Sequence, residues 1–301
     1  MTKLQERIIY VIQAYPKYNI KQVCRELGIN METLLLNLRE ISDSGIQIDV
    51  VDGEIIRFKW PERNKTVHNM SLGKDHVKLG LLGDTHLASK YDDLDSLNRA
   101  YDMIEDKGVD VVFHSGDLVD GIVSTPGYFS ELKEKTYTGQ LEYAIDRYPK
   151  YSGKTLVVSG NHDDYWYRLT GKEIIKDVAD KRDDIEYLGS SRRIINIDGL
   201  RVNVLHGKFK DSNPINNIYS YLDNIPTYKK PDIVHSGHYH TTKYQDYEGI
   251  EMFRSGAFMH QTPHDKKKNH NPEQSMYFVD VYYDDDGNVA EITHEEKTFR
   301  K

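Results

Sequence analysis

The chain has 301 residues, of which 38% are hydrophobic and 11% aromatic, so it can build a sizeable core and exceeds the usual length of one compact domain. Its 40 basic and 48 acidic side chains give a net charge of −8, which excludes a strongly basic nucleic-acid-binding protein but not a local positive site. The single cysteine, Cys24, excludes an intramolecular disulfide and fits a reducing compartment. The N-terminus lacks a signal-peptide core and no run approaches roughly 18 apolar residues, so we expect a cytoplasmic protein without a membrane span.

The first 60 residues predict three helices. The first runs through apolar positions at helical spacing and is ended by Pro16. The second covers residues 20–29. The third, over Met31–Ser42, carries an apolar stripe and follows Asn30, whose side chain suits an N-cap.

A turn and a hairpin complete this region. Cys24 stands four residues before Gly28, a pattern that resembles a helix-turn-helix because the small residue lets two helices cross closely and the glycine makes the turn. Residues 46–58 read as a β-hairpin around Asp52-Gly53. We therefore expect residues 1–60 to form a small domain that resembles a winged helix-turn-helix.

The rest of the chain has a different pattern. Residues 61–76 are polar and aperiodic and are interpreted as a linker. From Val77 onward, short apolar runs alternate with amphipathic stretches, which predicts an α/β domain with a substantial sheet over residues 77–301. The strand-like runs are Val77–Leu82, Val109–Phe113, Leu156–Val158, Arg201–Leu205 and Asp232–Val234. Two further runs near the C-terminus predict a closing hairpin around residues 284–288.

Five polar segments follow those strand-like runs in a fixed order. They are Asp84-Thr-His86, Gly116-Asp117-Leu-Val-Asp120, Gly160-Asn161-His162-Asp163, His206-Gly207 and Gly237-His238-Tyr-His240. Strand ends that meet at one edge of a sheet can bring such residues together around two metal ions. A single Asp-x-His is more often a solvated loop, but the ordered set of five argues strongly against that reading.

The donor types restrict the metal. In an extended segment, Asp84 and His86 at positions i and i+2 point the same way and can reach one ion. The carboxylate of Asp117 has two oxygens and can bridge two cations. Imidazole and carboxylate donors together suit Mn²⁺, Fe, Zn²⁺ or Ni²⁺, and they lack the thiolates of a structural zinc site.

The five segments resemble the motifs of the calcineurin-like metallophosphoesterase superfamily, over roughly Val77 to the C-terminus. The resemblance implies a two-sheet αββα sandwich that holds two divalent metal ions. Among the metals that suit the donors, we favour Mn²⁺. The resemblance also implies a first metal held by Asp84, His86 and His240, a second held by Asn161, His206 and His238, and a bridge from Asp117. His162 looks like the catalytic histidine of the family, and Asp120 looks like the carboxylate that orients it.

The implied chemistry is phosphoester hydrolysis. Two divalent ions lower the pKa of a bridging water, and the resulting hydroxide would attack phosphorus in line with the leaving oxygen. His162 as an imidazolium would donate a proton to the leaving group, while Asp120 would raise its pKa and fix its ring. The simpler alternatives are a hydrogen-bonding histidine beside the ligands and an ordinary loop carboxylate.

The substrate is less constrained than the chemistry. Our leading hypothesis is a phosphodiesterase or nuclease that acts on DNA or RNA, similar to the DNA-repair nucleases of this superfamily. The alternative is a phosphatase or small-molecule phosphodiesterase acting on nucleotides or phosphoproteins. A closed pocket beside residues 121–138 and 259–272 would favour that alternative, and an open groove would favour a polymer. A non-catalytic regulatory binding protein is the third hypothesis.

The N-terminal domain leaves the partner open. A winged helix-turn-helix most often contacts nucleic acid. However, residues 1–60 contain eight Lys and Arg against eight Asp and Glu, and Arg39 is the only basic residue of the candidate recognition helix. Such a helix usually carries more positive charge. The domain therefore mediates either DNA contact or dimerisation and protein binding. Lys208, Lys210 and Lys266–Lys268 are candidate phosphate contacts, with ordinary surface lysines as the simpler reading.

Overall fold

The computed structural model describes residues 2–299 except 16, 44–46, 52–54, 60–66, 124–126, 208–213, 224 and 227–229. The chain divides into two compact units, one of residues 1–63 with 166–172 and one of residues 64–165 with 173–301. The sequence places the boundaries at 60 and 76, and it gives no indication that the segment 166–172 groups with the N-terminal unit.

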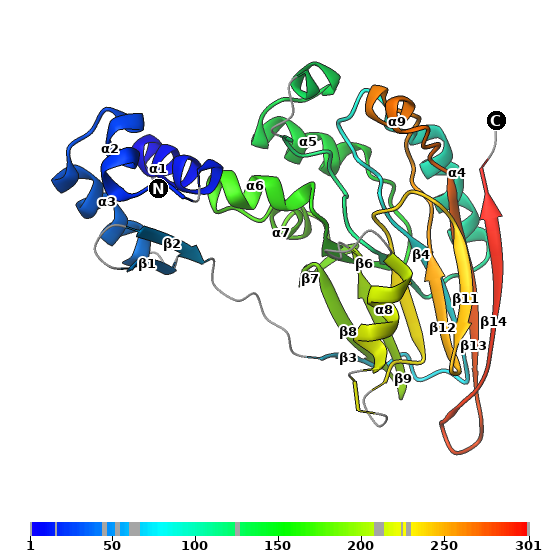
Figure 1. The fold of residues 1–301 in the computed structure, drawn as a ribbon. Coiled ribbons are helices and arrows are strands. Elements are labelled where there is room, and N and C mark those ends of the chain that lie inside the picture. The colour runs from blue at the N-terminus through cyan, green and yellow to red at the C-terminus, as the bar shows by residue number, and fades with distance from the viewer. Residues whose placement is uncertain are drawn as a thin grey trace. The chain divides into compact units, whose positions relative to one another are not determined.

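The N-terminal unit contains helices α1 (Lys3–Ala14), α2 (Ile20–Leu27) and α3 (Met31–Asp43), and then the antiparallel strands β1 (Gln47–Val51) and β2 (Ile55–Lys59) (Figure 1). Gly28 has φ +67° and ends α2, and the side chain of Asn30 accepts a 2.8 Å hydrogen bond from the backbone N–H of Thr33 at the start of α3. This is the predicted element order. Pro16 and the hairpin turn at 52–54 lie outside the described residues.

The second unit is built on two mixed sheets, each six-stranded in the described part of the chain. The β4 sheet has the spatial order β14 (Val289–Thr298), β13 (Ser275–Tyr283), β4 (His76–Leu82), β5 (Val111–His114), β6 (Lys154–Ser159) and β7 (Ile185–Ser190). The β9 sheet has the order β11 (Lys243–Tyr247), β12 (Ile250–Arg254), β10 (Ile233–Ser236), β9 (Leu200–Leu205), β8 (Arg192–Ile197) and β3 (His68–Met70). Strands β4 to β7 run parallel, as do β9, β10 and β12.

The main core lies between the two sheets. Fully buried apolar side chains of the β4 sheet, such as Leu79 and Phe113, share one cluster with those of the β9 sheet, such as Val202 and Ile233. Strand residues that alternate between the two faces place these side chains inward.

Helices cover both sheets. On the β4 sheet they are α4 (Leu94–Asp106), α5 (Tyr137–Arg147) and α7 (Ile174–Ala179), and on the β9 sheet α8 (Pro214–Asp223) (Figure 1). The chain also forms α6 (Asp163–Thr170), α9 (Pro263–Lys268) and a 3₁₀ helix η1 at Tyr128–Glu131. The hydroxyl of Tyr101 on α4 lies 2.8 Å from that of Tyr148 and 2.8 Å from Oγ1 of Thr155 on β6, which joins helices to the β4 sheet. Helix α8 packs its Ile218 and Leu222 on the outer face of the β9 sheet. The αββα sandwich predicted from the sequence is confirmed.

Strand β3 departs from the sequence prediction. It lies within the predicted linker 61–76, yet His68–Met70 pair in parallel with β8 and extend the β9 sheet. The carboxylate of Asp198 accepts backbone hydrogen bonds of 2.7 Å from Leu72 and 3.0 Å from Gly73. The second half of this segment is therefore part of the sandwich.

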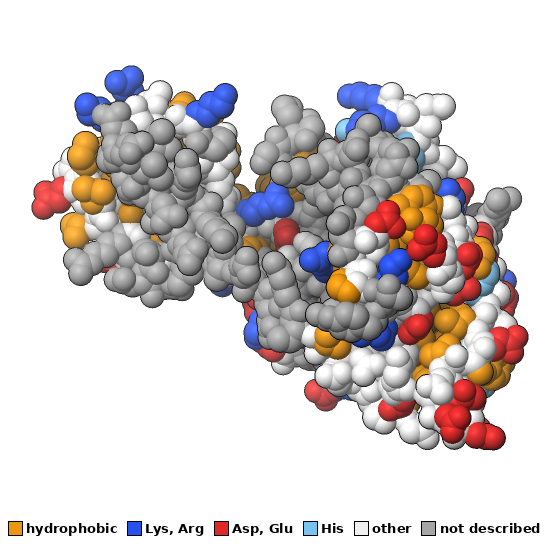
Figure 2. All heavy atoms as spheres, turned by 60° about the horizontal axis from the view of Figure 1, so that its bottom comes forward, with side chains coloured by type: hydrophobic (Ala, Val, Ile, Leu, Met, Phe, Trp, Pro, Cys, Tyr) orange, Lys and Arg blue, Asp and Glu red, His pale blue; other side chains and the backbone are white. Residues whose placement is uncertain are grey.

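Acidic side chains gather over the turn of the β13–β14 hairpin, at the lower right of Figure 2. Asp284, Asp285 and Asp286 are exposed there. This face is unfavourable for a polyanion. No described helix has the length and apolar character needed to cross a lipid bilayer.

Candidate functional site

All five predicted segments lie directly after strands at one edge of the sandwich. They follow β4, β5 and β6 in one sheet and β9 and β10 in the other. Parallel strands end at the same edge, so residues as far apart in sequence as Asp84 and His240 come together.

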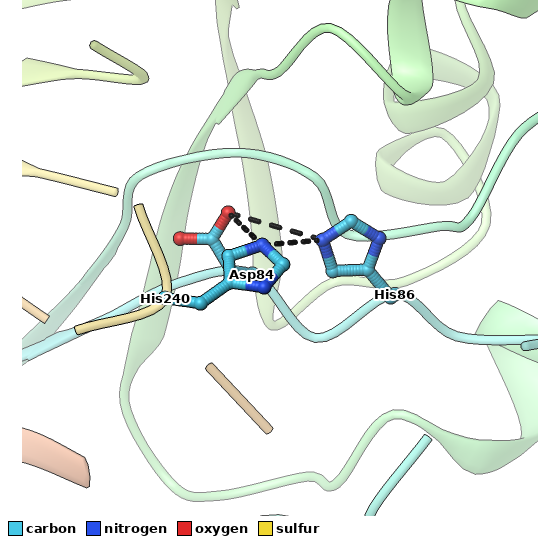
Figure 3. Close-up of side chains that lie close together, drawn as sticks. All are labelled: Asp84, His86 and His240. Atoms are coloured by element: carbon cyan, nitrogen blue, oxygen red, sulfur yellow. Dashed lines mark hydrogen bonds and ion pairs between the residues drawn. The ribbon is translucent and has the colours of Figure 1, made fainter. Parts of the chain in front are cut away.

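Asp84, His86 and His240 form the first group (Figure 3). Nε2 of His240 lies 3.5 Å from Oδ1 of Asp84 and 3.1 Å from Nε2 of His86. Asp84 is fully buried, and the backbone N–H of His238 donates to both of its oxygens at 3.0 and 2.8 Å. These three residues are the predicted ligands of the first metal.

Asp117, His206 and His238 form the second group, with Asn161 beside them. Nε2 of His206 lies 3.0 Å from Oδ2 of Asp117, 3.1 Å from Oδ1 of Asn161 and 3.3 Å from Nδ1 of His238. The same Asp117 oxygen lies 3.7 Å from Nε2 of His86 in the first group. Asp117 thus stands between the groups, where the sequence predicts a bridging carboxylate.

The second group has the chemistry of a cation site. Nδ1–H of His206 donates to the carbonyl oxygen of Ser115 at 2.9 Å, so in the neutral ring Nε2 carries a lone pair aimed at Asp117 and Asn161 oxygens. Burial would lower the pKa of His206, but the Asp117 carboxylate outweighs it and raises this pKa to about 9. Nε2 of the neutral His206 ring and the oxygens of Asp117 and Asn161 are all hydrogen-bond acceptors, so they face one another favourably only with a positive charge between them. The donor set therefore fits divalent cations with imidazole and oxygen ligands.

The backbone of the site is strained at its functional residues. Asp84, His86, Asp117, His238 and His240 have φ values of 51°, 42°, 53°, 76° and 53°. Residues other than glycine rarely adopt φ values in this left-handed region. Such strain collects at functional sites because only the surrounding fold can enforce it.

Glycines let the loops approach one another. A Cβ at Gly160 would overlap the carboxylate and the backbone nitrogen of Asp117. A Cβ at Gly237 would overlap the carboxylate of Asp84. Only glycine permits these contacts, which explains the glycines beside Asn161 and His238.

His162 and Asp120 are adjacent, as the sequence predicts. Nδ1 of His162 lies 2.7 Å from the backbone carbonyl oxygen of Asp120 and 3.5 Å from its Oδ1. The carboxylate is closer to His86, at 2.9 Å from Nδ1. Burial alone would lower the pKa of His162, but the charge of Asp117 and the contacts with Asp120 raise it to about 10. Hydrogen bonds from both histidines outweigh burial and hold the pKa of Asp120 well below its usual range.

Two further residues, Tyr128 and Asp163, contact this pair or the loops beside it, and the sequence assigns a role to neither of them. The hydroxyl of Tyr128 lies 2.8 Å from Oδ1 of Asp120. Asp163 accepts backbone hydrogen bonds from Gly160 at 2.8 Å and Val119 at 3.0 Å, and so ties the loops after β5 and β6 together. Burial and the charge of Asp117 raise the pKa of Asp163 to about 7. Asp163 belongs to the third predicted segment, whereas Tyr128 belongs to none.

His114 supports the loops of the site without belonging to either group. It is fully buried on β5, its Nδ1 accepts a 3.1 Å hydrogen bond from the backbone N–H of Gly116, and its Nε2 lies 3.3 Å from Oγ1 of Thr85. It therefore supports the loops that carry Asp84 and Asp117. Burial lowers its pKa to about 3 and keeps the ring neutral.

A pocket of about 240 Å³ opens beside the first group. His86, Asp120, His162 and His240 line one part of it, and Tyr128 lines another. The remaining wall includes Met259, Thr262, Pro263, His264 and Lys267. His264 therefore borders the site. His260 contacts a different residue, with Nε2 3.8 Å from Oδ2 of Asp93. Lys208 and Lys210 lie outside the described residues.

Comparison with known proteins gives one family and several relatives. The model of the calcineurin-like phosphoesterase superfamily domain matches residues 77–280. The DNA polymerase II small subunit of Methanothermobacter thermautotrophicus is 26% identical over 192 residues, which cover 52% of this chain and 39% of that protein. The same subunit of Methanocaldococcus jannaschii is 25% identical over 287 residues, which cover 78% of this chain and 46% of that protein. The chain therefore spans less than half the length of these relatives.

Solved structures give more distant likenesses. A structure described as a novel archaeal phosphodiesterase shares 16% identity, covering 74% of this chain and all of that one, with a TM-score of 0.45. A putative 5′-nucleotidase from Staphylococcus aureus shares 11% identity, covering 74% of this chain and 54% of that one, with a TM-score of 0.46.

Proposed function

Because the chain belongs to the calcineurin-like phosphoesterase superfamily, a family of metal-dependent hydrolases, we propose that it is a dinuclear-metal phosphodiesterase that cleaves nucleic acid. One observation carries the chemical part of the proposal. Donors that follow five strand ends gather in two largely buried groups with Asp117 between them, and His162 lies beside Asp117.

The proposed ligands are those of the sequence prediction. Asp84, His86 and His240 hold one ion, and Asn161, His206 and His238 hold the other, with Asp117 between them. Divalent ions held there would supply Lewis-acid stabilisation of charge on the phosphoryl oxygens and activation of water. We favour Mn²⁺, with Fe, Zn²⁺ and Ni²⁺ as alternatives.

His162 is the proposed proton donor to the leaving group. Its Nδ1–H is held by the carbonyl oxygen of Asp120, and the raised pKa favours a second proton on Nε2. The ring lines the pocket, where a leaving oxygen would meet it. Asp120 stabilises the imidazolium through its nearby charge.

Nucleic acid is proposed as the substrate for two reasons. The relatives named above are subunits of a DNA polymerase. The N-terminal unit has three helices followed by a β-hairpin, the element order expected of a winged helix-turn-helix. We propose that it adopts this fold, which most often contacts nucleic acid.

The decisive experiment is an activity panel with Mn²⁺ and single-stranded DNA, duplex DNA, RNA, nucleotides and a generic phosphodiester. Cleavage of DNA or RNA is expected, and His162→Asn should lower kcat by about 10²- to 10⁴-fold while Mn²⁺ stays bound. Turnover of small phosphate esters without cleavage of any polymer would remove the nuclease proposal and leave the phosphoesterase in place.

The pocket favours a second candidate, a phosphatase or a nucleotide phosphodiesterase. Part of its wall comes from the two segments, 121–138 and 259–272, whose closure would indicate small substrates. A volume of about 240 Å³ suits one small substituent better than a duplex. A nucleotide-to-polymer ratio of kcat/KM far above one in the same panel would decide for this candidate.

The N-terminal unit is also consistent with a protein partner. Helix α3 exposes Met31, Leu35 and Leu36, with 45%, 44% and 57% of their surfaces accessible. Apolar side chains on a candidate recognition helix suit protein contact or dimerisation better than a phosphate backbone. Fluorescence anisotropy with labelled DNA, set beside the mass of the protein in solution, separates DNA contact from dimerisation.

A further inference from the structure

Tyr128 closes a hydrogen-bonded network around the candidate proton donor. Its hydroxyl lies 2.8 Å from Oδ1 of Asp120, 3.3 Å from the carbonyl oxygen of Asp120 and 3.2 Å from Nδ1 of His162. The same Oδ1 lies 2.9 Å from Nδ1 of His86. One tyrosine hydroxyl therefore meets both members of the Asp120–His162 pair.

The hydrogen bonds of this network assign each proton to one atom. Burial and the charge of Asp120 raise the pKa of Tyr128 far above its usual range, so the hydroxyl stays protonated and donates to the carboxylate. Nδ1–H of His162 then donates to the Asp120 carbonyl, with the tyrosine oxygen as a second acceptor. The arrangement fixes Nδ1 of His162 as the protonated nitrogen and leaves Nε2 without a hydrogen bond to any described residue.

The segment that carries Tyr128 is anchored. The backbone N–H of Lys90 donates to the backbone carbonyl oxygen of Glu131 at 2.8 Å, and the backbone N–H of Lys133 donates to that of Ala88 at 2.8 Å. The ammonium of Lys133 also forms an ion pair with the buried carboxylate of Asp92. These contacts join the end of η1 to the loop that follows the Asp84–His86 segment, so the tyrosine is held from its C-terminal side.

We propose that Tyr128 is a positioning residue, which holds the Asp120 carboxylate and the His162 ring so that Nε2 of His162 faces the leaving group in the pocket. The inference deepens the proposed function and rests on it for the role of His162. It adds a residue outside the five segments to the machinery of the site. Because Tyr128 acts through two other residues, removing its hydroxyl should affect proton donation and spare substrate binding.

The test uses Tyr128→Phe, which keeps the ring in the pocket wall and removes the hydroxyl. The substrates are the phenyl and p-nitrophenyl esters of thymidine 5′-phosphate, with Mn²⁺, because phenolate needs a proton more than p-nitrophenolate does. We expect kcat for the phenyl ester to fall roughly 10- to 100-fold, kcat for the p-nitrophenyl ester to fall less than about 3-fold, and KM to stay unchanged. Equal losses on both esters would overturn the proposal.

Two comparisons sharpen the result. Tyr137→Phe is the matched control, because its hydroxyl also donates to a carboxylate, 2.6 Å from Asp177, away from the site. It should leave both esters unaffected. In a His162→Asn background, Tyr128→Phe should change kcat by less than about 2-fold, since the two residues act as one unit. Independent, multiplying losses would contradict the proposal.

A measurement without substrate separates this inference from the proposed function. In the protein labelled with ¹⁵N-histidine, Tyr128→Phe should speed exchange of the His162 Nδ1 proton with water about 10-fold or more, and Tyr137→Phe should not. Unchanged exchange would refute the positioning role. If the wild-type protein hydrolyses no phosphodiester while the exchange effect is present, the proposed function fails and the positioning role of Tyr128 stands.

Discussion

Oδ1 of Asp120 lies 2.9 Å from Nδ1 of His86, whereas Nε2 of the same ring faces the first candidate metal group. The carboxylate therefore fixes the tautomer of a predicted ligand, in addition to its contact with His162. The sequence predicts only that contact. A carboxylate behind a ligating imidazole orients the ring and increases its basicity.

Asp120→Asn should consequently weaken metal binding as well as proton donation. We expect Mn²⁺ affinity at one of two sites to fall by about 10- to 100-fold, measured by isothermal titration. Asp280→Asn provides the matched control, because Asp280 pairs with His76 at 2.7 Å outside the site. If Asp120→Asn binds two ions as tightly as the wild type, the carboxylate does not support His86.

Metal removal should lower stability, because the unfolded chain has no preformed site. At about 100 times the dissociation constant, each bound Mn²⁺ adds about 2.7 kcal/mol to the free energy of unfolding. Calorimetry with Mn²⁺ and then with a chelator measures the difference. Asp117→Asn should abolish most of the gain, since Asp117 touches both groups. Identical unfolding temperatures with and without Mn²⁺ would contradict the proposed metal centre.

Gly160→Ala should damage the site through simple overlap. Its Cβ would meet the carboxylate and the backbone nitrogen of Asp117, so the loops after β5 and β6 must separate. We expect a loss of about 1–3 kcal/mol in the free energy of unfolding and weaker Mn²⁺ binding. Gly73→Ala is the control, because no atom of the described residues would lie within 4 Å of its Cβ and only backbone strain at φ +63° remains. Unchanged Mn²⁺ binding by Gly160→Ala would show that the two loops can shift to accommodate the added Cβ without moving the metal ligands.

Much of the sandwich could be predicted because its central strands are apolar runs that end at a glycine or a polar segment. Strands β4, β5, β6, β9 and β10 all carry that pattern. Strand β3 does not, since His68-Asn-Met70 has no apolar periodicity and is a strand only because it pairs with β8. Tertiary pairing of this kind leaves no local signal.

The same limit applies within the site. The predicted ligands stand in recognisable segments, so their identities could be read directly from the sequence. The left-handed backbone at Asp84 and His238 could not, because their residue types do not require it. Tyr128 lies eight residues beyond Asp120 in a segment without periodicity, and only the fold returns its hydroxyl to that carboxylate.

His235 predicts an acid-sensitive step in stability. It is fully buried on β10, with Nε2 2.6 Å from Oγ of Ser255 and with no partner for Nδ1 among the described residues. Burial, with a smaller effect of His114, lowers the pKa of His235 to about 3. Its unfolded value is about 6.5. Below a pH of about 6.5 the unfolded chain binds a proton at this histidine, whereas the ring stays neutral in the folded protein. The contribution of His235 to the free energy of unfolding therefore falls as pH falls.

The expected slope is about 1.4 kcal/mol per pH unit between pH 6 and 4.5 for this one group. Urea unfolding of the metal-free protein should show the slope reduced by that amount in His235→Asn, with parallel curves above pH 7.5. His114, whose pKa burial also lowers to about 3, remains in the variant and keeps part of the slope. Parallel curves over the whole range would mean that His235 does not resist protonation in the fold.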